Sequence, residues 1–112
     1  MKIYHNPRCS KSRQGLAILE ASEKSFEIIK YLDTPITFDE LTEIIKLLKI
    51  TPLDLVRKNE AIWKEYYKGK NLSDAEIIKA MTKNPKLIER PIVINNGKAV
   101  IGRPPEHIKS IL

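Results

Sequence analysis

Cys9 is the residue of this 112-residue chain whose type and position most favour chemistry. It is the only cysteine, so the chain cannot form an internal disulfide. It lies where a first strand and its loop are predicted to meet a first helix. There the free amides of Ser10, Lys11 and Ser12 and the positive helix end should stabilise a thiolate. An inert buried cysteine is the alternative, but such a residue rarely lies in a Pro-Arg-Cys-Ser-Lys-Ser loop, so we favour a reactive thiol.

Positive charge surrounds Cys9 in the sequence. Arg8, Lys11 and Arg13 are close to it, and His5 could add a hydrogen bond or a charge. The same helix start could bind a phosphate-like anion, since free amides and the helix dipole both favour negative charge. A thiolate and an anion so close would repel each other unless further cations compensated.

Three arginines distant from Cys9 in the sequence are candidates for those cations: Arg57, Arg90 and Arg103. The planar fork of arginine suits a tetrahedral oxyanion better than the point charge of lysine does. Arg90 and Arg103 each precede a proline, which biases them toward extended backbone. Arg57 should end a short helix that begins at Thr51–Pro52. Spacing alone leaves open the alternative that all three form surface ion pairs.

Composition narrows the classes of partner. The net charge of +6 is compatible with an anionic small molecule, an acidic protein or nucleic acid. Most of the basic residues are lysines spread along predicted helices, which is typical of solvated faces, so we expect no nucleic-acid partner. With only His5 and His107 beside Cys9, we expect no zinc site.

The apolar segments are short. No apolar run approaches the ~18 residues of a membrane span, and Met1–Asn6 turns polar before a signal peptide could form. We therefore expect a cytoplasmic protein without a membrane partner.

The first third of the chain predicts a βαβ unit. Lys2–Tyr4 is typical of a short strand, and a helix is predicted over about Ser10–Ala21, with Leu16 and Leu19–Glu20 on one buried face. Phe26–Tyr31 is rich in β-branched and aromatic residues and predicts a second strand. This order implies a right-handed crossover and parallel pairing.

Helix-start signals dominate the middle of the chain, about residues 37–88. They are Thr37 with Glu40, Thr51–Pro52, and Ser73 with Glu76, the last of which opens a helix that ends at Asn84–Pro85. The side chains of Trp63, Tyr66 and Tyr67 are predicted to share one helical face, which we interpret as packing rather than a recognition surface.

The last part of the chain predicts a hairpin and a closing helix. Ile92–Ile94 and Lys98–Ile101 flank an Asn-Gly turn signal, and the helix should follow Pro104–Pro105. The whole order is βαβ, a helical insertion, then ββα. It predicts an α/β, thioredoxin-like fold with a mixed central sheet, in a single domain of residues 1–112.

Four ordered motifs resemble those of one family. Residues 5–13 (HNPRCSKSR) match the HNPxCxxSR signature of the glutaredoxin-coupled ArsC arsenate reductases. Leu55–Lys58, Glu89–Val93 and Gly102–Pro104 match the three arginine motifs of that family, in order. The resemblance covers essentially the whole chain. The segments Asn84–Leu87 and Ile101–Glu106 further resemble small chromosomal ArsC-like proteins of the YfgD type.

The resemblance implies roles for individual residues. Cys9 would attack arsenate as a thiolate, with His5 helping to form that thiolate. Arg57, Arg90 and Arg103 would hold the oxyanion and stabilise charge as it develops. Pro91 would be the family's cis-proline.

The resemblance also implies the reductants. Glutathione would be a co-substrate that reduces the adduct to arsenite and leaves Cys9 as a mixed disulfide, which glutaredoxin clears. No bound cofactor is implied. The absence of a second cysteine in the loop is consistent with an external thiol, and we expect a monomer.

Two other functions fit the same fold. One is a regulator resembling Spx, which binds RNA polymerase, although Ser12 stands where Spx usually has the second cysteine of a CxxC switch. The other is a glutathione-dependent thiol reductase with a different substrate. Assaying arsenate reduction with glutathione and glutaredoxin separates these from the first hypothesis.

Overall fold

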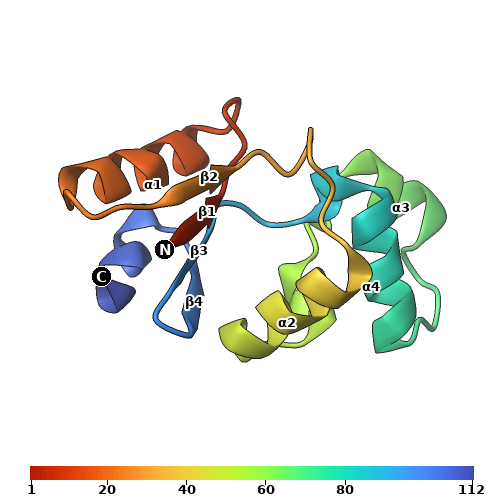
Figure 1. Cartoon of the computed structure of the whole chain (residues 1–112). Coiled ribbons are helices and arrows are strands. Elements are labelled where there is room, and N and C mark those ends of the chain that lie inside the picture. Colours follow the sequence, from red (N-terminus) through yellow and green to blue (C-terminus); the bar gives the residue numbers. More distant parts are fainter. The chain divides into compact units, whose positions relative to one another are not determined.

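A computed structural model of the chain describes all of residues 1–112, which divide into two units. The first unit combines residues 1–34 with residues 90–112, and the second consists of residues 35–89. The four strands belong to the first unit, whereas the second is helical (Figure 1). The predicted insertion at about 37–88 falls within the second unit.

The first unit is built on a mixed four-stranded sheet. Its elements are β1 (Lys2–Tyr4), α1 (Ser10–Ala21), β2 (Glu27–Ile29), β3 (Ile92–Asn95), β4 (Lys98–Ile101) and the 3₁₀ helix η3 (Pro105–Ile111). The strand order is β2-β1-β3-β4, with β1 parallel to β2 and both other pairs antiparallel. This arrangement confirms the predicted α/β, thioredoxin-like fold and the parallel pairing of the first two strands.

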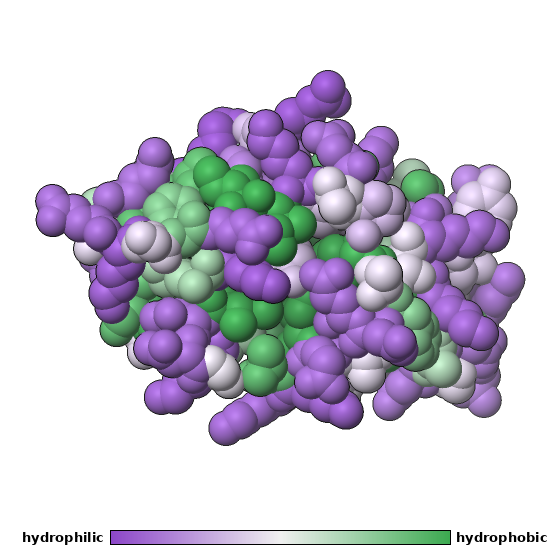
Figure 2. Space-filling view, viewed as in Figure 1, coloured by the Kyte–Doolittle hydropathy of each residue, from purple (hydrophilic) through white to green (hydrophobic).

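Strand β2 is shorter than predicted from the sequence. We expected Phe26–Tyr31, but only Glu27–Ile29 pairs with β1. The reason is its edge position, since a strand with one neighbour is limited to that neighbour's three residues. After β2 the chain turns, with the amides of Asp33 and Thr34 donating to the carbonyl of Lys30. Ile28 is 45% exposed, and apolar surface is visible in the region of β2 in Figure 2.

The core of the first unit lies between the sheet, α1 and η3. Ile3, Leu19, Val93 and Ile108 are completely buried in one cluster. The buried face of α1 consists of Ser12, Gly15 and Leu19. The predicted face was therefore partly wrong, because Leu16 is only half-buried and Glu20 is exposed.

The β3–β4 hairpin closes with the predicted tight turn. Asn96 and Gly97 both have positive φ, 52° and 72°, as a two-residue type I′ turn requires. This turn fixes the register that pairs Ile92 with Ile101, so the ends of the hairpin bring Pro91 and Gly102 together. The amide of Gly102 donates to the carbonyl of Pro91 over 2.8 Å.

The second unit contains five helical segments: α2 (Phe38–Leu48), η1 (Pro52–Leu55), α3 (Ala61–Tyr66), α4 (Asp74–Lys83) and η2 (Pro85–Leu87). Their starts follow the predicted signals. Thr37 Oγ1 accepts the amide of Glu40, and Ser73 and Glu76 form a reciprocal capping box. None of the helices in either unit is long and apolar enough to cross a membrane.

Two local expectations in the second unit are wrong. Arg57 does not end a helix, because η1 stops at Leu55. Tyr66 does not share the buried face with Trp63: its side chain is 56% exposed, whereas Trp63 is buried and stacks on Tyr67 with ring centroids 5.4 Å apart. Helix α3 has only six residues, so its aromatic positions are set by tertiary packing rather than by a continuous helical face.

Candidate active site

Asn6 organises the loop that carries Cys9. Its side chain is buried, its carbonyl accepts the amide of Cys9 over 3.0 Å, and its Oδ1 accepts the amide of Arg8 over 3.0 Å. Arg13 Nη1 donates to the carbonyl of Pro7 over 3.0 Å from the first turn of α1. These bonds tie the loop to the helix at both ends, so Cys9 occupies a defined position.

Cys9 is the N-cap residue of α1, as predicted. Its backbone is extended, and its carbonyl accepts the amide of Arg13 over 3.0 Å, the first bond of the helix. The amides of Ser10, Lys11 and Ser12 precede that bond and donate to no acceptor of the protein. Three adjacent N–H donors at a helix N-terminus form a site that favours an anion.

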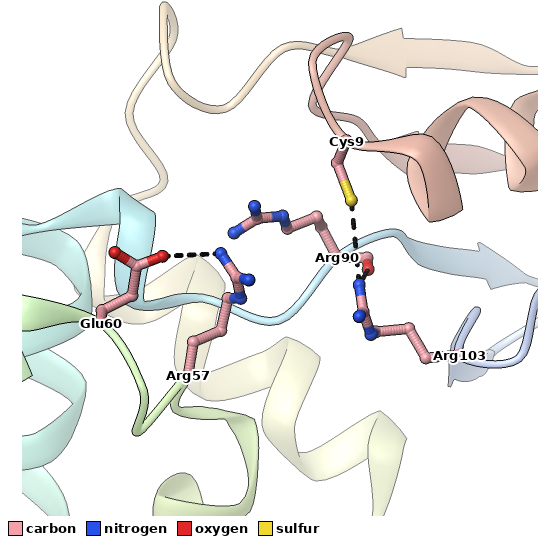
Figure 3. Close-up of polar contacts among 5 residues, drawn as sticks. All are labelled: Cys9, Arg57, Glu60, Arg90 and Arg103. Atoms are coloured by element: carbon pink, nitrogen blue, oxygen red, sulfur yellow. Dashed lines mark hydrogen bonds and ion pairs between the residues drawn. The ribbon is translucent and has the colours of Figure 1, made fainter.

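Arg103 is the charged group that contacts the Cys9 sulfur. Its Nη1 lies 3.8 Å from Cys9 Sγ and also donates to the carbonyl of Arg90 over 3.4 Å (Figure 3). Arg103 follows β4 and is exposed, and Cys9 is half-buried. A guanidinium at this distance stabilises negative charge on the sulfur.

Arg90 has a donor without an acceptor. Its Nε is buried and makes no hydrogen bond, and the side chain extends away from Arg103 (Figure 3). Buried donors are nearly always paired, so this N–H is suited to an acceptor that a ligand supplies. The Arg90–Pro91 peptide bond is cis, as the family resemblance implies, and Arg103–Pro104 is also cis, which the sequence did not indicate.

His5 and Ser12 form a buried pair beneath the loop. His5 Nδ1 lies 2.7 Å from Ser12 Oγ, which also accepts the amide of Asn6 over 3.0 Å. Burial lowers the pKa of His5 below 6.5, and the nearby charges of Lys30 and Arg13 add to this. The imidazole is therefore neutral at pH 7. With Asn6 donating to Ser12 Oγ, the hydroxyl hydrogen is free to donate to Nδ1, which places the imidazole proton on Nε2.

This pair changes how two predicted residues can act. His5 hydrogen-bonds Ser12, not Cys9, and in its neutral form it adds no positive charge to the site. The hydroxyl of Ser12 is occupied by His5 and Asn6, so its backbone amide is the group available to an anion. The role of Asn6 was not foreseen, although asparagine two residues before a turn amide is a known turn former.

Arg57 belongs to the second unit and has an acidic partner there. Its Nη1 donates to Glu60 Oε1 over 2.8 Å, and both side chains are half-buried (Figure 3). Its amide donates to the carbonyl of Leu87 over 2.7 Å, and the amide of Glu89 donates to Leu55 over 2.9 Å. Glu60 was missed from the sequence, although a spacing of three residues allows such a pair.

No group of three or more His, Cys, Asp or Glu side chains that could hold a metal ion occurs in the structure. Around Cys9, the polar groups that could contact a ligand are one thiol, two guanidinium groups and a row of amides. This combination provides a nucleophile beside donors for an oxyanion.

The chain belongs to the ArsC family, whose model matches residues 4–111. It is 46% identical to YfgD of Escherichia coli, over 100% of this chain and 96% of that protein. It is 48% identical to an arsenate reductase of Haemophilus influenzae, over 98% of this chain and 97% of that protein. The solved structure of an arsenate reductase from Vibrio cholerae superposes with a TM-score of 0.94 at 45% identity, covering 100% of this chain and 98% of that one.

Proposed function

We propose that the protein reduces arsenate to arsenite through the thiolate of Cys9. In the first step the Cys9 sulfur attacks arsenic(V), an S–As bond forms, and one arsenate oxygen leaves as water after taking up protons from solvent. Arg103, Arg90 and the amides of residues 10–12 bind the remaining oxygens and stabilise charge that develops on them.

The second step is the reduction. The thiolate of glutathione attacks the Cys9 sulfur, an S–S bond forms, and the S–As bond breaks. Arsenic leaves with the electron pair of that bond, so arsenic(V) becomes arsenic(III), released as arsenite. Cys9 remains as a mixed disulfide with glutathione. The thiolate of a glutaredoxin then attacks the glutathione sulfur of this disulfide and releases the Cys9 thiolate.

The observation that carries the proposal is the contact of Arg103 with Cys9 at a helix start whose amides are open. A structural cysteine needs neither a guanidinium at its sulfur nor three free amides beside it. The buried Arg90 Nε adds a donor that a bound oxyanion would satisfy. The role of Arg57 as a further oxyanion ligand rests on its family motif alone.

The chemistry also favours a location and an assembly. A cysteine that must return to its thiolate after every turnover requires a reducing compartment supplied with glutathione, which the cytoplasm provides. A monomer is sufficient, because the chain itself supplies every candidate site residue.

The test is a coupled assay. NADPH oxidation is measured with arsenate, glutathione, glutaredoxin and glutathione reductase. Cys9→Ser should abolish arsenate reduction and leave the circular dichroism spectrum unchanged. Arg90→Ala and Arg103→Ala should each lower turnover by roughly 10- to 1000-fold, the range for removing a donor to developing charge.

His107→Ala is the matched control, because His107 is exposed on η3 and contributes no side chain to the site. It should retain wild-type turnover. Arsenate reduction by folded Cys9→Ser would contradict the mechanism. A folded wild-type protein that exchanges disulfides but leaves arsenate unreduced would contradict the choice of substrate.

A further inference from the structure

A hollow of about 330 Å³ lies on the first unit beside the cysteine loop. One wall is the loop itself, with His5, Asn6 and Arg8, and the other is the turn after β2, with Lys30 and Asp33. Its size is at the lower end of the range for small-molecule sites. The loop bonds already described make the first wall rigid, since Asn6 holds the amides of both Arg8 and Cys9.

The charged side chains of this hollow have no partners. Arg8, Lys30 and Asp33 make no ion pair and no side-chain hydrogen bond, even though all three line the same surface. Elsewhere in the chain, Arg57 and Lys46 do have carboxylate partners. Burial and the charges of Lys30 and Arg13 lower the pKa of the nearby His5, so these two positive charges act on this side of the loop.

We propose that this hollow binds the charged groups of glutathione, so that its thiol is presented to Cys9. The inference rests on the proposed function and deepens it. Glutathione carries two carboxylates and one ammonium group at pH 7. Arg8 and Lys30 would bind the carboxylates, and Asp33 would bind the ammonium group, so the charges match in both sign and number.

The dimensions allow this arrangement. Consecutive Cα atoms are about 3.8 Å apart, so the backbones of Arg8 and Cys9 are closer together than the two ends of a tripeptide ligand. A tripeptide in extended form spans roughly 10 Å, with the thiol on its middle residue. A carboxylate held at Arg8, the residue that directly precedes Cys9, would therefore leave the glutathione thiol within reach of the cysteine.

The test uses a reaction that needs neither arsenate nor glutaredoxin. Oxidised glutathione reacts with the Cys9 thiolate: an S–S bond forms to Cys9, the S–S bond of the reagent breaks, and one glutathione thiolate leaves. The second-order rate is followed by mass spectrometry of the protein. Bis(2-hydroxyethyl) disulfide, a neutral reagent, is measured in parallel and reports the intrinsic reactivity of Cys9 in each variant.

Arg8→Gln and Lys30→Gln should each slow the reaction with oxidised glutathione by about 1.5- to 5-fold relative to the neutral disulfide, as expected for an exposed ion pair. Asp33→Asn should slow it as well. This variant is decisive. If the site only attracted an anionic reagent in general, removing the negative charge of Asp33 would speed the reaction rather than slow it. Lys24→Gln, an exposed site outside the hollow, is the matched control and should keep the wild-type ratio.

Two results would overturn the proposal. The first is equal slowing of both reagents by Arg8→Gln and Lys30→Gln, which would mean that the variants only change Cys9. The second is a faster reaction of Asp33→Asn with oxidised glutathione, or a slowing by Lys24→Gln as large as that by Arg8→Gln and Lys30→Gln. Either result would mean that general electrostatic attraction, not binding in the hollow, sets the rate. An absence of arsenate reduction with intact disulfide exchange would instead refute the proposed function and leave this measurement interpretable.

Discussion

Replacing Gly102 by alanine tests how the fold positions Arg103. A Cβ atom on Gly102 would lie 2.8 Å from Pro91 Cγ, 3.0 Å from Ile108 Cδ1 and 3.3 Å from Ile108 Cγ1. Both neighbours are buried, so neither can move into solvent. The ring of Pro91 cannot rotate away, and Ile108 is fixed in the core with Leu19. The backbone at Gly102 must therefore shift.

Overpacking of this kind costs about 1–3 kcal/mol. For a chain of this length each kcal/mol lowers Tm by roughly 4 °C, so Gly102→Ala should lose roughly 4–12 °C. Gly15→Ala is the matched comparison, because its Cβ would meet the same atoms, Pro91 Cγ at 2.8 Å and Ile108 Cδ1 at 3.0 Å. Gly15 lies inside α1, where alanine is favoured over glycine by about 1 kcal/mol, so its loss should be smaller.

The two variants should also differ at the site. Gly102 directly precedes Arg103, so a shift there displaces the guanidinium that contacts Cys9. We expect arsenate to protect Cys9 from iodoacetamide less well in Gly102→Ala than in Gly15→Ala. Thermal unfolding by circular dichroism and labelling with and without arsenate measure both effects. A Tm for Gly102→Ala equal to or above that of Gly15→Ala would refute the packing argument.

Three further predictions concern caps, burial and arginine. Ser73→Ala should lower the free energy of unfolding by about 1 kcal/mol in urea denaturation, because the cap that holds the amide of Glu76 is lost. The pKa of His5 is lower in the folded protein than in the unfolded chain, so the neutral imidazole contributes fully to stability above pH 6.5, and this contribution is lost as the pH falls below 6.5. Between pH 7.5 and 5.5, His5→Asn should therefore lose less stability than the wild type. Arg57→Lys should weaken protection of Cys9 by arsenate, because the charge remains but the fork is lost; unchanged protection would remove Arg57 from the oxyanion site.

Local signals in the sequence predicted most of the elements. The Ser73–Glu76 capping box, the turn at Asn96–Gly97 and the start of α1 after Pro7 each depend on atoms within a few residues. The errors arose where an element's position in the folded structure, rather than its local sequence, sets its length or its exposure. Strand β2 is short because it lies at the edge of the sheet, and Tyr66 is exposed because α3 is too short to keep one face buried.

The candidate site divides in the same way. The position of Cys9 at the start of a helix is a local property and was predictable. The hydrogen-bond partner of the Ser12 hydroxyl was not predictable, because it depends on where the sheet places His5, seven residues earlier in the chain. The Ser12 amide, by contrast, belongs to the helix start. The contact between Arg103 and Cys9 joins residues 94 positions apart, and only the family motifs indicated it.

The distribution of charge between the two units distinguishes among the partners that the net charge of +6 allows. The first unit holds ten Lys and Arg residues against five Asp and Glu, whereas the second holds ten against nine. Four of the five arginines are in the first unit, which also carries Cys9. If lysine-rich helices bound nucleic acid, the excess of positive charge should lie in the helical unit. There, acidic residues nearly balance the basic ones. The excess instead lies in the unit that carries Cys9, as expected if its partners are small anions such as the arsenate and glutathione proposed above.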